Sequence, residues 1–260
     1  MQILGLRFLN GSASEAVAEI SRTGGVVVVP AAPALVRLQS DEVYRRAMTG
    51  ADLAMPDSGL MVLVWKILGR GSMTRISGLT YLKRLIREPA FQESGRAFFV
   101  LPAEAAKTKL LNWAERAGVK LGPEDCYVAP HYGHVVEDAQ LLEQIGRQQP
   151  AHIVIAIGNG PQEKLGVYLR DHLAYRPAIH CIGAALGFLT GDQVAIPDWA
   201  DRFYLGWLFR LCAQPRVFIP RLARALQLPI LMVQYGENLP ALKRPEEVRN
   251  QRKKGDSGVR

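Results

Sequence analysis

The feature that most constrains the fold is a regular alternation of short apolar strands with longer helical segments. The strongest strand signal is His152–Ile157 (HIVIAI), which runs into a glycine-containing turn and then a helical segment. Apolar, β-branched runs of this kind are typical of strands buried on both faces. Similar runs are Val26–Val29, Ala51–Met55, Arg96–Leu101, Cys126–Ala129 and Ile179–Ile182. The alternation predicts βαβ crossovers, and therefore an α/β fold with a Rossmann-like, mostly parallel sheet flanked by helices.

The segments between these strands carry helical patterns. We expect helices at Pro33–Thr49, Leu60–Leu68, Ala103–Ala117 and Val136–Gln148. Because Leu60–Leu68 is apolar apart from Lys66, it is predicted to be a buried helix. In parallel sheets, ligands bind outside the carboxyl ends of the strands. A site is therefore expected in the loops after Val29, Met55, Leu101, Ile157 and Ile182.

Positive charge is concentrated near the C-terminus. The whole chain of 260 residues carries a formal net charge of +8. The segment from Arg202 to Arg260 holds twelve Lys and Arg against four Asp and Glu, an excess of eight, so the preceding residues are close to neutral. This asymmetry predicts an anionic partner for the C-terminal part. On charge alone this partner could be phospholipid, pyrophosphate or nucleic acid. Of these we expect pyrophosphate groups and an anionic membrane surface, and no nucleic acid.

The change of composition after Gly191 predicts three parts. Residues 1–191 form the Rossmann-like core. Residues 192–243 interleave aromatic side chains with arginines and are expected to form a helical, membrane-proximal appendage, which prolines such as Pro220 break into short pieces. Residues 244–260 have almost no apolar side chains and are expected to be a disordered basic tail.

The cysteines and the N-terminus bear on the cellular compartment. Cys126, Cys181 and Cys212 are widely spaced and form no CxxC pair, which indicates a reducing compartment without a disulfide framework or zinc site. The N-terminus has no charged region ahead of a long apolar run, so no secretory signal is expected. We also find no run of roughly 20 apolar residues, the length that crosses a membrane. The sequence therefore predicts a cytoplasmic protein that binds peripherally at the inner face of the cell membrane.

Asp57 is the first candidate functional residue. It follows a predicted strand and precedes a predicted helix, where a carboxylate is placed to act as a general base toward a sugar hydroxyl. The same position suits a helix cap, with Gly59 giving backbone freedom. Both roles could hold, because one carboxylate oxygen can cap the helix while the other faces the cleft.

The loop from Gly158 to Glu163 is the second candidate. Gly158 and Gly160 allow a ligand to approach the backbone, and the amides at the following helix start suit a phosphate. Gln162 and Glu163 are placed to hydrogen-bond a nucleobase or sugar, although Glu163 could instead complement the helix dipole. A purely structural βα turn explains the same residues. The loop lacks the third glycine of the GxGxxG fingerprint, which counts against an NAD(P)-dependent oxidoreductase.

Three arginines of the C-terminal part form the third candidate. Arg221 and Arg224 can share one helical face, and Arg216 precedes them by one to two turns. Arginines that converge on a pyrophosphate neutralise a leaving group without a metal. A solvated charged face is the alternative. His131 and His134 have no carboxylate motif around them, and the chain has no DxD-type acidic pair, so we expect no metal site.

Read in order, these segments resemble the WecG/TagA/CpsF family of bacterial glycosyltransferases over most of the chain. The order and spacing of five blocks make the resemblance more specific than any one motif. The blocks are Ala51-Asp52 with Asp57-Ser58-Gly59, Arg75-Ile76-Ser77-Gly78, Ile155–Glu163, Gly183 with Phe188-Leu189-Thr190-Gly191, and Gly206-Trp207-Leu208 with Gln214-Pro215-Arg216.

The resemblance implies an inverting, metal-independent transferase without a cofactor, acting in cell-envelope polysaccharide biosynthesis. It would move a sugar, often N-acetylmannosamine, from a UDP-sugar donor to a polyprenyl-pyrophosphate-linked acceptor. The resemblance leaves open whether the chain forms a homo-oligomer. It assigns Asp57 as the general base and places the other candidates at the substrates. These are Gly158, Gly160, Gln162, Glu163, Arg75, Arg216, Arg221 and Arg224.

Several polar residues of the family pattern are replaced in this chain. The family's Thr-Pro-Asn stands here as Val29-Pro30-Ala31, and its Gly-Ser-Asp as Gly78-Leu79-Thr80. An acidic position of the pattern is Gly187. These replacements favour an alternative function, a catalytically inactive glycosyltransferase-like binding protein that assists polysaccharide assembly.

Overall fold

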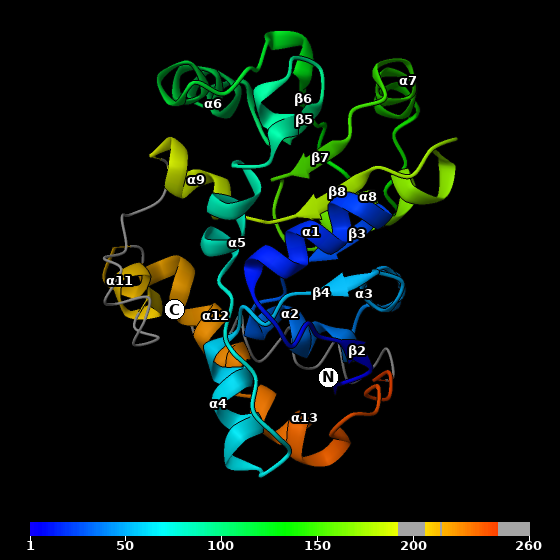
Figure 1. Cartoon of the computed structure of the whole chain (residues 1–260). Helices are drawn as coiled ribbons and strands as arrows, with labels where there is room; N and C mark the ends of the chain where they lie inside the picture. Colours follow the sequence, from blue (N-terminus) through cyan, green and yellow to red (C-terminus); the bar gives the residue numbers. More distant parts are fainter. Residues whose placement is uncertain (192–205, 214, 244–260) are drawn as a thin grey trace.

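A six-stranded sheet in the order β4-β3-β8-β7-β5-β6 forms the centre of the molecule (Figure 1). The computed structural model describes residues 1–191, 206–213 and 215–243. All pairings between neighbouring strands of this sheet are parallel. The strands are Gly25–Val28 (β3), Leu53–Ala54 (β4), Ala97–Leu101 (β5), Cys126–Val128 (β6), His152–Ile155 (β7) and Ala178–Cys181 (β8). The parallel α/β fold predicted from the sequence is confirmed.

Helices cover both faces of the sheet and form two apolar cores. Side chains alternate along a strand, so Val26 and Val28 enter one core and Val27 and Val29 the other. The first core packs α2 (Ala32–Val36), α3 (Glu42–Thr49), α4 (Gly59–Ile67), α7 (Ala139–Gln148), α8 (Pro161–His172) and α13 (Leu228–Tyr235). The second core packs α1 (Ala13–Thr23), α5 (Gly78–Leu85), α6 (Glu104–Ala117) and α9 (Ala185–Thr190).

The single helix predicted for Pro33–Thr49 is in fact interrupted. The 3-10 helix Arg37–Gln39 follows α2, and α3 then begins after Asp41. The Asp41 backbone is extended, and its carboxylate accepts a hydrogen bond from Tyr44 N at 2.9 Å. An aspartate in this arrangement caps a new helix, which is why the earlier one does not continue.

The helix predicted for Leu60–Leu68 exists as α4, but the prediction that it is buried is wrong. Met61, Val62 and Trp65 face the first core, whereas Leu63 is 55% exposed and Ile67 is 73% exposed. Leu63 and Ile67 are four residues apart and therefore lie on the same side of the helix. The apolar side chains of α4 thus lie partly in the first core and partly on the surface.

The N-terminal segment is joined to the end of the C-terminal part. Gln2–Ile3 (β1) and Leu6–Arg7 (β2) form a short antiparallel hairpin. Leu4 N and Gly5 N donate hydrogen bonds to the carbonyls of Gly236 and Glu237, at 2.9 and 2.8 Å. The hairpin was not predicted, because two-residue strands leave no alternating pattern.

The C-terminal part consists of helices where the structure describes it. Gly206–Ala213 (α11) is followed by Pro215–Ala225 (α12), which packs against α11 and α2. Pro220 was predicted to break this segment but lies inside α12. The carbonyl that Pro220 leaves unpaired is that of the exposed Arg216, so water can bind it. The tail 244–260 and the segment 192–205 lie outside the described residues.

Helices α12 and α13 together have the length and composition of a membrane-spanning segment, although the sequence has no uninterrupted apolar run there. Pro215–Tyr235 spans 21 residues with a mean hydropathy of 1.2, and is long and apolar enough to cross a membrane by length and composition alone. A search for uninterrupted apolar residues misses it because arginines divide the run. In the structure, 22% of the apolar window is buried against the rest of the protein.

Candidate functional site

Asp57 lies at the carboxyl edge of the sheet, between β4 and α4. It does not cap α4, because the Ser58 hydroxyl accepts the hydrogen bond from Met61 N, at 3.2 Å. Asp57 Oδ1 instead accepts a hydrogen bond from Gly78 N, the first residue of α5, at 3.1 Å. The capping role predicted for Asp57 at its own helix is therefore corrected. Its half-buried carboxylate faces the positive end of a different helix, which stabilises negative charge there.

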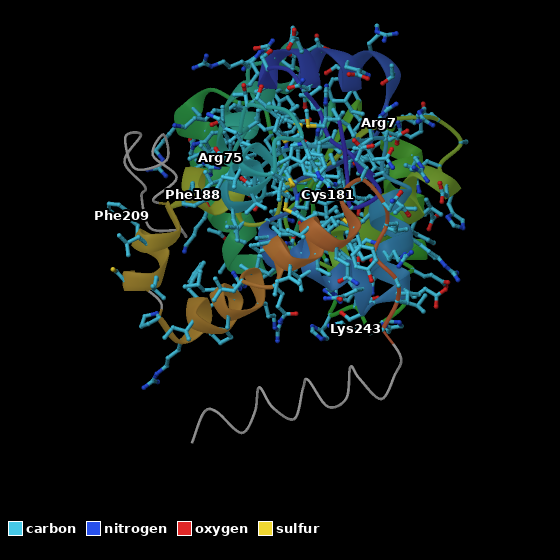
Figure 2. All side chains as sticks on the ribbon, turned by 90° about the horizontal axis from the view of Figure 1, so that it is seen from below. Arg7, Arg75, Cys181, Phe188, Phe209 and Lys243 are labelled. Atoms are coloured by element: carbon cyan, nitrogen blue, oxygen red, sulfur yellow. The ribbon has the colours of Figure 1, made fainter. Side chains whose placement is uncertain are left out.

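The segment before α5 holds the Asp57 backbone in place. Arg75 Nε donates to the Asp57 carbonyl at 2.8 Å, and Ile76 N donates to the Pro56 carbonyl at 3.1 Å. Arg75 was predicted to contact substrate, and the structure shows it bound to the loop that carries Asp57. Figure 2 shows Arg75 on the same side of the molecule as Phe188 of α9 and Phe209 of α11. Contact with substrate stays a prediction for this arginine.

Gly78 lies beside Asp57, close to the ends of β3 and β8. A Cβ atom at this position would lie 3.4 Å from Val29 Cγ1 and 3.4 Å from Ala185 Cβ. The start of α5 thus lies next to the end of β3 and the start of α9. The neighbouring strands β3 and β8 are followed by helices on opposite faces of the sheet, α2 in the first core and α9 in the second. Ligands of α/β sheets bind at such a switch point.

The glycine loop between β7 and α8 is fixed by buried side chains. Gly158 and Gly160 have positive φ angles of 96° and 104°. Glu163 Oε2 accepts a hydrogen bond from Gly160 N at 2.6 Å, and Gln162 Oε1 accepts one from Gly183 N at 2.9 Å. Gln162 Nε2 also donates to Glu163 Oε1 at 2.9 Å. The two side chains therefore join the loop after β7 to the turn after β8.

Gln162 and Glu163 are fully buried. Burial raises the pKa of Glu163, although hydrogen bonds from Gln162 and Gly160 and the charge of Arg37 act in the opposite direction. Sequence reasoning expected these side chains to bind a nucleobase or sugar. In the structure, each side chain binds another part of the protein and so positions the loop. Their contact with a nucleobase or sugar stays a prediction.

Arg37 belongs to the same region, although no motif in the sequence pointed to it. A Cβ atom at Gly160 would lie 2.4 Å from Arg37 Nη1, so this guanidinium lies directly beside the loop. Arg37 Nη2 pairs with Asp41 Oδ2 at 2.5 Å, and the guanidinium stacks 4.9 Å from the centre of the Tyr44 ring. Lys164 Nζ lies 3.5 Å from the same Asp41 oxygen. Burial alone would raise the pKa of Asp41, but these hydrogen bonds and charges lower it.

The C-terminal arginines lie on α12, beside the carboxyl edge of the sheet. All three are exposed, and Arg221 stacks 5.3 Å from the centre of the Phe218 ring. Helix α12 packs against α2, which begins after β3 (Figure 1). Pyrophosphate binding by Arg216, Arg221 and Arg224 stays a prediction.

His131 and His134 lie exposed in the loop between β6 and α7, where the His134 carbonyl accepts a hydrogen bond from Lys164 at 2.9 Å. Over residues 1–191, 206–213 and 215–243, no group of three or more His, Cys, Asp or Glu side chains comes together as a metal site.

Known proteins resemble this chain over most of its length. A model described as "Glycosyl transferase WecG/TagA/CpsF family" matches residues 1–243. Two relatives carry the name N-acetylglucosaminyldiphosphoundecaprenol N-acetyl-beta-D-mannosaminyltransferase. The one from Bacillus spizizenii is 25% identical over 212 residues, 81% of this chain and 78% of the relative. The one from Bacillus subtilis is 23% identical over 175 residues, 67% of this chain and 66% of the relative. Since the family model spans nearly the whole chain, the protein belongs to the WecG/TagA/CpsF family of glycosyltransferases.

Proposed function

We propose that this glycosyltransferase moves a hexose, such as N-acetylmannosamine, from a UDP-sugar to a polyprenyl-pyrophosphate-linked acceptor of cell-envelope polysaccharide. Family membership and the names of the two relatives support the reaction class. The observation that carries the proposal is the half-buried Asp57 carboxylate at the carboxyl edge of the sheet, fixed by Gly78 N.

Asp57 acts as the general base of a single displacement. Its carboxylate takes the proton of the acceptor hydroxyl as that oxygen attacks the anomeric carbon of the donor. The bond between this carbon and the nucleotide diphosphate breaks on the opposite face, so the configuration inverts. The diphosphate leaves without a metal ion, stabilised by Arg216, Arg221 and Arg224 and by backbone amides of the loop after β7 other than that of Gly160, which is bound to Glu163.

The protein works in the cytoplasm at the inner face of the membrane, because its acceptor carries a prenyl chain. The excess of positive charge after Arg202 supports attachment to anionic lipid. Flotation of the full chain with anionic liposomes, and loss of flotation after truncation near Gly191, is the expected result. Equal flotation of both forms would contradict this attachment.

The transfer itself is tested with a panel of UDP-sugars, a prenyl-pyrophosphate glycan acceptor and product mass. Asp57→Asn is expected to lower kcat by about 10²–10⁴-fold, the usual contribution of general base catalysis. Asp171→Asn is the control, because this aspartate is exposed on α8 and pairs with Arg170. An Asp57→Asn enzyme with the wild-type rate would show that Asp57 is not the base.

One observation favours the alternative of an inactive binding protein. Val29, which replaces a threonine of the family pattern, is buried and packs against Gly78 beside Asp57. The surroundings of Asp57 are thus more apolar at this position than in the family pattern. Turnover of any UDP-sugar by the wild-type protein would exclude this alternative.

A further inference from the structure

The large apolar side chains that remain exposed are concentrated on a few helices. Of eleven such residues in the described part of the chain, eight belong to α4, α11, α12 and α13, and a ninth, Leu226, directly follows α12. They are Leu63, Ile67, Leu208, Val217, Ile219, Leu222, Leu226, Ile230 and Val233. Exposed apolar side chains that gather on neighbouring helices indicate an interaction site.

Three of these helices lie together although they are far apart in the sequence. Helix α13 packs against α4 and α2, and α12 packs against α2 as well. Figure 1 shows α13 alongside α4, with α12 close by. Residues of the core and residues of the C-terminal part therefore contribute to one surface, formed by α4, α12 and α13, which we call the acid-free face.

The name describes the charge of the underlying sequence. Residues 58–87 and 202–236 are the two longest stretches of the chain without Asp or Glu. They contain six and five Lys or Arg respectively. Lys66 and Arg70 are exposed at the end of α4, and Arg216, Arg221 and Arg224 are exposed along α12. A surface that serves solubility alone mixes both signs of charge, whereas this one combines exposed apolar side chains with cations only.

We propose that α4, α12 and α13 bind the surface of an anionic lipid bilayer as a single face. Leu63 and Ile67 of α4 and Ile230 and Val233 of α13 enter the boundary of the acyl chains, while the surrounding Lys and Arg contact the lipid phosphates. The inference deepens the proposed function, on which it rests for a lipid-linked acceptor. It differs from attachment by the C-terminal part alone, because it assigns a lipid contact to a helix of the core.

A second copy of the chain fits this surface less well. A symmetric dimer would place the same patch against itself, and the acid-free face offers no carboxylate to pair with its own arginines. Like charges brought together in this way oppose association. Anionic lipid supplies the missing negative charge.

The face would also fix the height of the candidate base above the membrane. Asp57 directly precedes the cap of α4, and Ile67 is the last residue of that helix. At 1.5 Å per residue, the two ends of α4 are about 12 Å apart. Binding of α4 to lipid would therefore keep Asp57 within roughly that distance of the depth that Ile67 reaches. A hydroxyl of a sugar linked to membrane-bound pyrophosphate lies in such a layer.

Vesicle flotation of the full-length protein tests the α4 contact. The probes are phosphatidylcholine vesicles with and without about one third phosphatidylglycerol, the proportion that gives a strongly anionic surface. The double variant Leu63→Gln/Ile67→Gln is expected to lose about ten-fold or more of the binding to anionic vesicles, since two apolar contacts are removed. Val135→Gln is the matched control, because Val135 is 62% exposed but lies before α7, outside the face. It should float like the wild type.

Three results would overturn the proposal. The first is unchanged flotation of the double variant, even if a C-terminal truncation abolishes flotation. The second is equal binding of the wild type to neutral and anionic vesicles. The third is a wild-type oligomer that becomes monomeric in the double variant by light scattering, which would make the face a contact between copies.

Circular dichroism and thermal unfolding verify that the variants fold. Transfer by the wild type to a water-soluble, short-prenyl acceptor is measured separately, so failure of the proposed function is distinguishable from failure of the lipid contact.

Discussion

Two buried polar clusters lie on opposite faces of the sheet and support different halves of the candidate site. On the α5 side, Tyr81 OH lies 2.8 Å from His180 Nδ1, and His180 Nε2 lies 3.0 Å from His152 Nδ1. On the α8 side, Arg37 and Lys164 surround Asp41 next to the glycine loop. The first cluster is a chain of hydrogen bonds between groups that are neutral at pH 7, and the second is an ionic network.

The difference shows how each half of the site is held. The hydrogen-bonded chain, Tyr81–His180–His152, joins α5 to β8 and β7, and α5 begins with the Gly78 amide that binds Asp57. The ionic network joins α3, the 3-10 helix before it and the start of α8, and therefore supports the loop after β7. We expect mutations in the two clusters to differ in size, in pH dependence and in which substrate they affect.

The largest effect on stability is expected from Asp41→Ala. This change leaves the buried Lys164 ammonium without its ion pair and removes the cap of α3, which together cost about 3 kcal/mol of unfolding free energy. Urea denaturation measures the loss. Glu42→Ala is the control, because Glu42 also forms an ion pair but is exposed, and should change stability by less than about 0.5 kcal/mol. Equal losses in the two variants would contradict a structural role of the network.

His180→Phe is expected to have the next largest effect. It leaves Tyr81 OH and His152 Nδ1 without their partner, at a cost of about 2 kcal/mol. Because α5 carries Gly78, we also expect kcat to fall while KM for the UDP-sugar changes little. Steady-state kinetics and urea denaturation separate the two effects. A variant that loses stability while kcat is unchanged would show that the Tyr81–His180–His152 hydrogen bonds do not position Asp57.

The histidines and Glu163, a carboxyl of the glycine loop beside the ionic network, predict opposite responses to pH. Burial lowers the pKa of His152 to about 4, and burial together with His152 lowers that of His180. The unfolded chain then binds these protons more tightly than the native protein, so stability is present above pH 6.5 and is lost as the pH falls toward 4. Glu163 has the opposite sign, because its pKa is raised above 4.5, and its contribution is lost as the pH rises through the folded value.

Stability measured against pH checks these signs. Between pH 6.5 and 4, each histidine should cost up to about 1.4 kcal/mol per pH unit. The His152→Phe variant should show a shallower slope over this range, and Glu163→Gln should gain on the wild type as the pH rises above 4.5. Parallel curves for the wild type and His152→Phe would contradict the assignment.

These contacts mark the boundary between what the sequence predicts and what it does not. The strand at His152–Ile157 is evident from its apolar run, yet nothing local shows that the His152 ring stacks on His180. The position of Asp57 at a strand end was predicted, whereas its partner Gly78 lies 21 residues away and could not be. Arg37 was missed for the same reason. Hydrophobic periodicity finds α4 but gives no information on whether its apolar side meets a core or another partner.

The smallest expected effect is the difference in stability between Tyr44→Phe and Tyr81→Phe, two changes at buried tyrosines. Tyr44 and Tyr81 are both fully buried, and burial raises the pKa of each phenol. The Tyr44 hydroxyl has no hydrogen-bond partner in the part of the chain that the structure describes, whereas Tyr81 OH is bound to His180. Tyr44→Phe should therefore leave stability unchanged or raise it by less than about 1 kcal/mol, and Tyr81→Phe should lower it by about 1 kcal/mol. Both changes remove one oxygen from a buried ring. The difference between the two variants in urea denaturation therefore measures the contribution of the Tyr81–His180 hydrogen bond to stability. Equal losses would mean that Tyr44 OH binds a group such as a buried water beside Glu163.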